Sequence, residues 1–483
     1  MDAFITLVRN KIISPLENFT ERINIVHILM LSLVITALSV AYHRSGVENL
    51  ELETRIPFYL ADRPLLNKLY DTRIIEANLY VGRELSYVFD FLDAQFISLS
   101  VSLGFPNFIS PSFYIFTIAI GLMLWQFCVA ELKLKRWIGL GMVLLFWTSP
   151  NAFLGGDYFR SAKPGVSVCI VALYYLVYHV LHSEHQNRTY RPRFGVWVAG
   201  FGIAWAAAWF DREGLYLVGV LMAFLLIWGS VFPSRNILKL LAIFGAVLVL
   251  FVLYAYLVAP WLTFYFNHYW PGMSYQQLPW WVFKLPHVLA FSLAAGVFMY
   301  IDTLRFLVGN ISRAAAFLLI VSIILVAFFI YLREKSTGNN TRAFSLAALG
   351  LITCELVLTC AMNTIMVIYL PQITMQDLML TLYYMPLAST LCMTLALVIS
   401  QFSMHKFLPV WLLLILLIAA IVGNILAIPV HYTVMRQGYM KPVYDSMPSM
   451  LAALRNIRNS HYLPPLDIQR DGVYQFFRAK FGR

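Results

Sequence analysis

The sequence predicts an all-α polytopic membrane protein of about 11 transmembrane helices, or 12 if the segment 286–308 also crosses. Of its 483 residues, 60% are hydrophobic and only 12% are charged. Soluble proteins carry about 25% charged residues, so this chain has too few charges to cover a water-exposed surface. Apolar runs near the roughly 20 residues that cross a bilayer recur along the chain. A large soluble protein is therefore excluded.

The first span follows a mixed, polar segment at residues 1–24 and covers Ile25 to Tyr42. No small-residue cleavage site follows it, so it is expected to be a retained anchor rather than a signal peptide. The segment 286–308 contains Asp302 and Arg305, which are costly in a lipid-facing span, and is assigned to the outer surface. The remaining spans are expected at 112–130, 137–149, 165–182, 194–210, 214–232, 238–259, 314–332, 343–368, 379–400 and 407–430.

Basic residues in the short loops predict a cytoplasmic N-terminus, because such residues gather on the cytoplasmic side. Segments 43–111, 150–164 and 211–213 then face outward. The chain is expected to form one bundle over 1–430, which includes the first periplasmic loop 43–111, followed by a small periplasmic tail at 431–483. The basic residues on which the sidedness rests are Arg9, Lys11, Arg22, Lys133, Lys135, Arg136, Arg188, Arg191, Arg193, Arg235 and Lys239.

The net charge of +11 fits cytoplasmic loops and contact with lipid phosphate. Nucleic acid is not an expected partner, because no basic-aromatic segment carries a recognisable binding motif. The five cysteines all lie in apolar runs and show no zinc spacing. No cofactor, disulfide framework or structural metal is therefore expected.

The first outer loop holds many of the carboxylates of the chain, including Asp71 and Glu84. From Ile74 to Leu103, apolar residues recur at helical spacing and predict an amphipathic outer-loop helix. Arg83, Asp90 and Asp93 fall on its other face. That face is either a solvated surface or the source of a general base that faces the membrane.

Two further groups of charges are expected at the outer lip of the bilayer. Asp157, Arg160 and Lys163 are three residues apart and would share one side of a helix. They either bind a phosphate oxyanion or anchor a helix end by snorkelling. The tight connection Asp211, Arg212 and Glu213 is either a helix-hairpin cap or a second site for a phosphate-linked substrate.

Two features are expected beside these charges. Glu355 lies within an apolar span and must face the bundle interior, where it binds substrate or locks helix packing as a neutral group. The aromatic belt that includes Trp270 and Trp280 either anchors spans at the headgroups or stacks on sugar rings.

This arrangement resembles the GT-C superfamily of membrane glycosyltransferases. The resemblance rests on the long carboxylate-rich outer loop, the run from Gly82 to Tyr87, the lip charges and the turn at 211–213. It implies transfer of a sugar from a polyprenyl-phosphate donor to a glycan, lipid or protein acceptor on the outer face of a bacterial inner membrane. No adjacent pair of acids stands in the first loop, so the base is not identified. Arg and Lys can hold a monophosphate leaving group, so no obligatory metal is expected.

The roles that follow are assigned to residues in three groups. The candidate catalytic acids are Asp71, Glu84, Asp211 and Glu213, and the candidate phosphate-binding cations are Arg83, Arg160, Lys163 and Arg212. The candidate substrate-binding residues are Asp157, Trp270, Trp280 and Glu355. The alternatives are a transporter or flippase for a lipid-linked or anionic solute, and a non-catalytic membrane scaffold. A transporter is expected to hold its polar residues in mid-membrane rather than at the outer lip.

Overall fold

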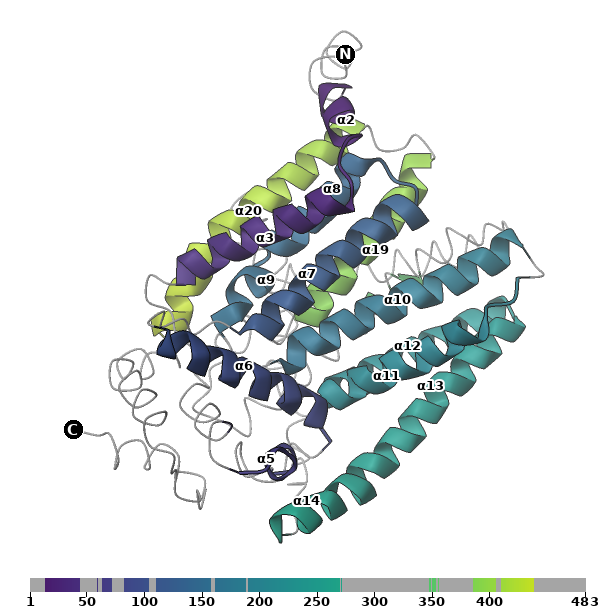
Figure 1. Ribbon diagram of the computed structural model, residues 1–483. Coiled ribbons are helices and arrows are strands. Elements are labelled where there is room, and N and C mark those ends of the chain that lie inside the picture. Colours follow the sequence, from purple (N-terminus) through teal and green to yellow (C-terminus); the bar gives the residue numbers. More distant parts are fainter. Residues whose placement is uncertain are drawn as a thin grey trace, which may run out of the picture.

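A computed structural model describes most of the first 271 residues and two later helices (Figure 1). The described residues are 14–43, 59, 63–71, 82–103, 110–157, 161–187, 190–269, 271, 347–348, 350–352, 355, 385–404 and 410–437. Within them every regular element is a helix, which confirms the all-α class. The expected spans at 286–308 and 314–332, and most of 343–368, lie outside the described residues. The total of 11 or 12 spans therefore stays a prediction.

Six described segments are long and apolar enough to cross a membrane, which supports a membrane protein. They are Ile25–Tyr42, Pro111–Glu131, Ala162–Gln186, Arg212–Ser230, Arg235–Asn267 and Leu412–Pro429. Three shorter apolar helices accompany them: Arg136–Thr148, Phe194–Phe210 and Met385–Ser400. All nine coincide with apolar runs of the sequence. In lipid, a single apolar segment can form hydrogen bonds to all its own backbone N–H and C=O groups only as a helix.

The elements follow one another along the chain as short and long helices. The first half contains α2 (Ser14–Thr20), α3 (Ile25–His43), α5 (Leu65–Leu69), α6 (Glu84–Ser102), α7 (Pro111–Gln126) with the π-helical η3 (Phe127–Glu131), α8 (Arg136–Thr148), α9 (Pro150–Leu154) and the 3₁₀ turn η4 (Gly155–Asp157). It is followed by α10 (Ala162–Gln186), α11 (Phe194–Phe210), α12 (Arg212–Val231), α13 (Arg235–Leu253), the π-helical η5 (Tyr254–Val258), α14 (Ala259–Asn267), α19 (Met385–Met404) and α20 (Val410–Gln437).

Helix α10 is the centre of the bundle and packs against α7, α11 and α19. Of its apolar window, 72% is buried, against 17% for the long helix Arg235–Asn267. The core around α10 is rich in aromatic rings, among them Phe113, Phe146 and Trp147, which are fully buried. Such rings remove large apolar areas from the solvent and stabilise the bundle by packing. Side chains at the two ends of α10 are therefore held by a rigid core.

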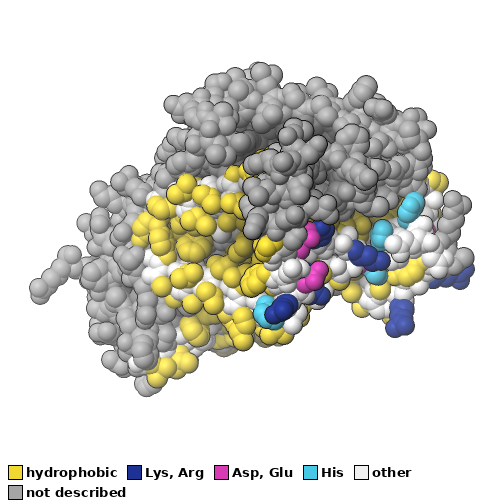
Figure 2. All heavy atoms as spheres, turned by 90° about the horizontal axis from the view of Figure 1, so that it is seen from above, with side chains coloured by type: hydrophobic (Ala, Val, Ile, Leu, Met, Phe, Trp, Pro, Cys, Tyr) yellow, Lys and Arg dark blue, Asp and Glu magenta, His cyan; other side chains and the backbone are white. Residues whose placement is uncertain are grey.

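The bundle has two chemically different ends. At one, called the basic end, Arg136 donates to the carbonyl oxygen of Ile23 at 3.0 Å and Asn236 donates to that of Tyr190 at 3.3 Å. These contacts join the expected cytoplasmic loops to one another and to the N-terminal segment. Seen from the top of Figure 1, charged and histidine side chains gather beside a broad apolar area (Figure 2).

The other end, called the loop end, carries α5, α6, α9 and the connection between α11 and α12 (Figure 1). Helix α6 packs on α7 and α11, and α5 packs on α6 and α14. Asn67 of α5 donates to the carbonyl oxygen of Phe266 in α14 at 2.6 Å. The helices of the first loop therefore lie across the end of the bundle.

The solvated interpretation of the acidic face of α6 is wrong, whereas Leu85 and Phe89 of its apolar face pack against the core as predicted. Its carboxylates Asp90 and Asp93 are 1% and 2% exposed, whereas the apolar Leu92 and Phe96 are 52% and 43% exposed. The Oδ1 atom of Asp90 accepts bonds from the backbone N–H and the hydroxyl of Ser161, at 3.0 and 2.8 Å. The acidic face of α6 is therefore turned inward, and it is not a solvated surface.

Candidate functional site at the loop end

Three segments that are far apart in the sequence meet at the loop end. They are residues 82–84, the first turn of α10, and the connection between α11 and α12. Two cations and two carboxylates form what we call the charge cluster, which consists of Arg83, Lys163, Asp211 and Glu213. The sequence expected all four on one side of the membrane, and the structure brings them into direct contact.

Within the described residues, the charge cluster is a connected set of ion pairs. A guanidinium nitrogen of Arg83 lies 2.9 Å from Oδ1 of Asp211. The Nζ atom of Lys163 lies 3.3 Å from Oδ2 of Asp211 and 2.6 Å from Oε2 of Glu213. Lys163 is therefore shared between two carboxylates. The side chains of Lys163, Asp211 and Glu213 are 5%, 0% and 2% exposed, and that of Arg83 is 12% exposed.

The tight helical hairpin between α11 and α12 fixes the two carboxylates. Asp211 adopts an extended backbone, and its Oδ1 accepts the N–H of Glu213 at 3.0 Å, which makes it the N-cap of α12. A Cβ atom at Gly214 would lie 2.0 Å from the carbonyl oxygen of Ala207 in α11. Only glycine permits this approach, so the hairpin is closed directly beside the cluster. The cap expected at this turn is confirmed, and its role in binding a phosphate-linked substrate stays a prediction.

The two cations and two carboxylates of the cluster balance in charge. Burying any one of these ions alone would be costly, and each is offset by a partner of opposite sign. Lys163 and Arg83, which were expected to hold phosphate, are thus already engaged by carboxylates. Arg212 differs, because it is half-buried and forms no ion pair with any residue that the structure describes.

Glu84 lies beside the cluster in the first turn of α6 and is 4% exposed. Its Oε2 accepts bonds from the indole N–H of Trp209 at 2.7 Å and from the hydroxyl of Tyr254 at 3.0 Å. Its Oε1 accepts the backbone N–H of Gly82 at 3.2 Å. Burial raises the pKa of Glu84 above its ordinary value, while these donors act in the opposite direction. A buried carboxyl with a raised pKa is typical of acid–base sites.

Gly82 sets the direction in which Arg83 and Glu84 leave the preceding chain. Its φ is +86°, a value that residues with a side chain rarely adopt. A Cβ atom there would also lie 3.2 Å from Cβ of Ala255 in η5. The run from Gly82 onward, which carries part of the resemblance, is therefore positioned by a conformation that requires glycine.

Asp93 connects α6 to the start of α7. Its carboxylate accepts the N–H of Ser112 at 2.9 Å, a hydroxyl bond from the same residue at 2.5 Å, and a hydroxyl bond from Ser110. It therefore caps the N-terminus of a neighbouring helix. Burial raises the pKa of Asp93 to about 7.

The raised pKa of Asp93 predicts a measurable pH dependence of stability. Unfolded Asp titrates near pH 3.9, so the folded state holds this proton more tightly. The stability from Asp93 is complete below that pH and is lost as the pH rises through about 7. Asp93→Asn is expected to flatten the melting-temperature profile between those two values. The same pH slope in wild type and variant would contradict the assignment.

Asp71 belongs to a separate contact between α5 and α14. Arg63 donates to its Oδ2 at 3.1 Å, and the hydroxyl of Tyr269 donates to its Oδ1 at 3.1 Å. Arg63 also donates to Asn267 at 2.9 Å. These contacts hold α5 on α14, and among the described residues the partners of Asp71 are not members of the charge cluster. Among the candidate acids, Glu84, Asp211 and Glu213 are thus the ones brought together.

The remaining candidate residues are placed less completely. Asp157 ends η4, and α10 begins at Ala162, so Asp157 and Lys163 do not share one helix as the spacing suggested. Arg160, Trp270 and Trp280 lie outside the described residues. Glu355 is 3% exposed and accepts the hydroxyl of Thr390 in α19 at 2.6 Å.

Three partners of the site were not expected from sequence: Trp209, Tyr254 and Thr390. Trp209 stands two residues before Asp211, and this nearness to the charged turn is the signal that could have found it. No such signal marks Tyr254 or Thr390, which lie in apolar runs. Within the part of the chain that the structure describes, no group of three or more His, Cys, Asp or Glu residues could hold a metal ion.

Comparisons with known proteins assign no family. No protein-family model, curated protein or solved structure matches the chain. Its function is therefore inferred from the chemistry of the charge cluster and Glu84.

Proposed function

We propose that the chain is a membrane glycosyltransferase of the GT-C type. It would move a sugar from a polyprenyl-phosphate donor to a glycan, lipid or protein acceptor at the loop end. The observation that supports this proposal is the meeting of residues 82–84, the first turn of α10 and the α11–α12 turn around four buried charges. In this proposal the loop end faces the periplasm and the basic end faces the bacterial cytoplasm.

The proposed reaction needs a base and a site for a departing phosphate. The bond between the anomeric carbon and the phosphate oxygen breaks, and the acceptor hydroxyl oxygen bonds to that carbon. The hydroxyl proton passes to a carboxylate, and the negative charge stays on the lipid phosphate. Glu84 is the best-placed base, because it is the candidate acid whose carboxylate is bound by neutral donors and not by a cation.

Arg212 is the best-placed cation for the lipid phosphate. It adjoins the cluster as the first residue of α12, and it forms no ion pair within the described residues. Arg83 and Lys163 would have to exchange a carboxylate partner to bind the donor. Their role is therefore to hold Asp211 and Glu213, which leaves Arg212 to bind the phosphate.

Arg212→Gln is expected to raise the KM for the donor about 10-fold or more, while it changes stability by less than about 0.5 kcal/mol, as is usual at surface sites. The matched control is Arg235→Gln, because Arg235 is likewise the first residue of a helix but lies at the basic end. A KM that is equal in both variants would contradict the role of Arg212. The KM for the donor is measured from initial rates at varied donor concentration.

A transporter or flippase is the second candidate, favoured by Glu355. This carboxyl is buried and accepts the hydroxyl of Thr390 in α19, as expected of an ion or substrate path. One experiment separates the two candidates. Purified protein in vesicles is incubated with a panel of radiolabelled polyprenyl-phosphate sugars and candidate acceptors. Label in the acceptor supports the transferase. Movement of the labelled lipid across the vesicle membrane without sugar transfer supports the transporter.

A further inference from the structure

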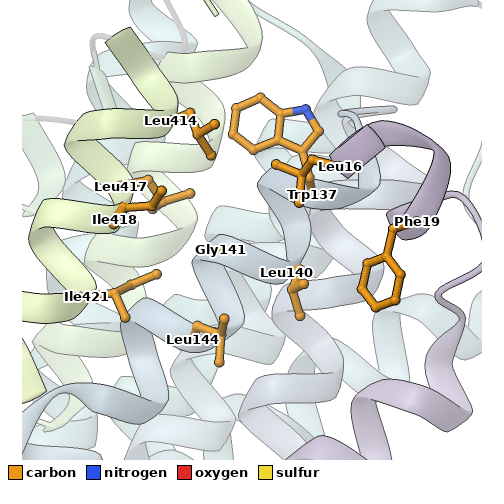
Figure 3. Close-up of a pocket in the computed structure, with 10 residues that line it drawn as sticks. All are labelled: Leu16, Phe19, Trp137, Leu140, Gly141, Leu144, Leu414, Leu417, Ile418 and Ile421. Atoms are coloured by element: carbon orange, nitrogen blue, oxygen red, sulfur yellow. The ribbon is translucent and has the colours of Figure 1, made fainter. Parts of the chain in front are cut away.

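An apolar groove opens between α2, α8 and α20, near the basic end of the bundle (Figure 3). Its volume is about 500 Å³, within the range of about 300–1,000 Å³ that is typical of small-molecule sites. Helix α2 contributes Leu16 and Phe19, α8 contributes Trp137, Leu140, Gly141 and Leu144, and α20 contributes Leu414, Leu417, Ile418 and Ile421.

The two long walls of the groove run in parallel. On α8 and on α20 the lining residues fall at positions i, i+3, i+4 and i+7, so each wall extends about 10 Å at 1.5 Å per residue. Gly141 brings the helices together at the floor, because a Cβ atom there would lie 2.0 Å from Leu417. Asn424 donates to the carbonyl oxygen of Leu145 at 3.2 Å and closes the far end. The shape is a straight trough for an unbranched apolar chain.

The mouth of the groove is polar and positively charged. Trp137 is 4% exposed, yet its indole N–H has no hydrogen-bond partner within the described part of the chain. Arg136 precedes it and donates to backbone carbonyl oxygens of Glu21 and Ile23, not to a carboxylate. Lys135 pairs with Glu17 of α2 and remains 55% exposed. The indole N–H is enclosed, so an anion at this mouth would meet the guanidinium of Arg136, which pairs with no carboxylate of the described residues.

We infer that this groove binds one acyl chain of an anionic phospholipid. The acyl chain fills the trough between α8 and α20, and Arg136 faces the phosphate. The charge at the mouth selects an anionic headgroup over a zwitterionic one. This site is independent of the proposed transferase reaction.

The test uses the full chain in detergent, with phosphatidylglycerol and phosphatidylcholine of identical acyl chains as probes. Native mass spectrometry measures how much lipid stays bound at each lipid concentration. Wild type is expected to retain one phosphatidylglycerol and to bind phosphatidylcholine at least 10-fold more weakly. Ile418→Trp places a large ring in the trough and is expected to lower phosphatidylglycerol binding at least 10-fold.

Leu416→Trp is the matched control, because Leu416 is 53% exposed, Ile418 is 52% exposed, and only Ile418 lines the groove. Trp137→Phe keeps the apolar volume and the charge of the mouth, so it is expected to bind phosphatidylglycerol like wild type. Arg136→Gln is expected to abolish the preference for phosphatidylglycerol, whereas Arg193→Gln, another exposed cation of the basic end, leaves it intact.

Two outcomes would overturn the inference. One is equal retention of both lipids by wild type, Trp137→Phe and Arg136→Gln, since it would leave the polar mouth without a role. The other is a dimer of wild type that Ile418→Trp converts to a monomer, since the groove would then hold a second copy of the chain. Neither outcome depends on sugar transfer.

Discussion

Lys163→Met is expected to lower the free energy of unfolding by about 3–5 kcal/mol, the range found when one partner of a buried ion pair is removed. Lys163 is shared by Asp211 and Glu213, at 3.3 and 2.6 Å. Without it, two carboxylates that are 0% and 2% exposed would lie side by side with Arg83 as the only cation of the cluster. The melting temperature, followed by tryptophan fluorescence in detergent, measures the loss.

Lys135→Met is the matched control for this loss. Lys135 also pairs with a glutamate, Glu17, but its side chain is 55% exposed. Exposed ion pairs contribute about 0–1 kcal/mol, so this variant is expected to melt close to wild type. The triple variant Lys163→Met, Asp211→Asn and Glu213→Gln removes the uncompensated charges and is expected to recover part of the loss. Equal melting temperatures of Lys163→Met and Lys135→Met would refute the argument from burial.

Helix positions were predictable from the sequence wherever apolar runs end at charges. The runs expected at 25–42 and 194–210 correspond to helices Ile25–His43 and Phe194–Phe210. The span at 238–259 was expected to end at residue 259, whereas the helix continues through η5 and α14 to Asn267. Pro260 does not end the helical segment, because it stands in the first turn of α14, where its missing N–H costs little.

The inward face of α6 could not be predicted from an amphipathic pattern. Such patterns identify the buried side by assuming that water surrounds the other, and this assumption fails where lipid and protein compete for the apolar face. Asp90 and Asp93 find N–H and hydroxyl donors in Ser161, Ser110 and Ser112. These donors are remote in sequence, so only the folded structure reveals them.

The candidate site was predictable as a set of residues but not as a set of roles. Arg83, Lys163, Asp211 and Glu213 stand out because so little around them is polar, and all four meet. The sequence assigned cations to phosphate and acids to catalysis. Their mutual pairing depends on distances that no spacing encodes. Trp209 and Tyr254, which donate hydrogen bonds to Glu84, both lie in apolar runs.

Glu84→Gln is expected to lower the proposed transferase activity by about 10²–10⁴-fold, the usual contribution of a general base. The amide is nearly isosteric, and its oxygen can still accept from Trp209 and Tyr254. Its NH₂ group would face the N–H of Gly82, which donates to Oε1 in wild type. That conflict costs about 1–3 kcal/mol, so the variant is expected to fold with a lowered melting temperature. Rates at saturating donor measure the effect.

The pH dependence of Glu84 separates a base from a purely structural carboxyl. Burial raises its pKa above the unfolded value, so its contribution to stability is present at low pH and is lost as the pH rises through the folded pKa. A base must be ionised, so kcat/KM is expected to rise over that same interval, opposite in direction to stability. Glu84→Gln should abolish both trends. If the variant loses the stability trend but keeps the wild-type rate profile, Glu84 supports the fold alone, and the base must be sought at Asp211 or Glu213.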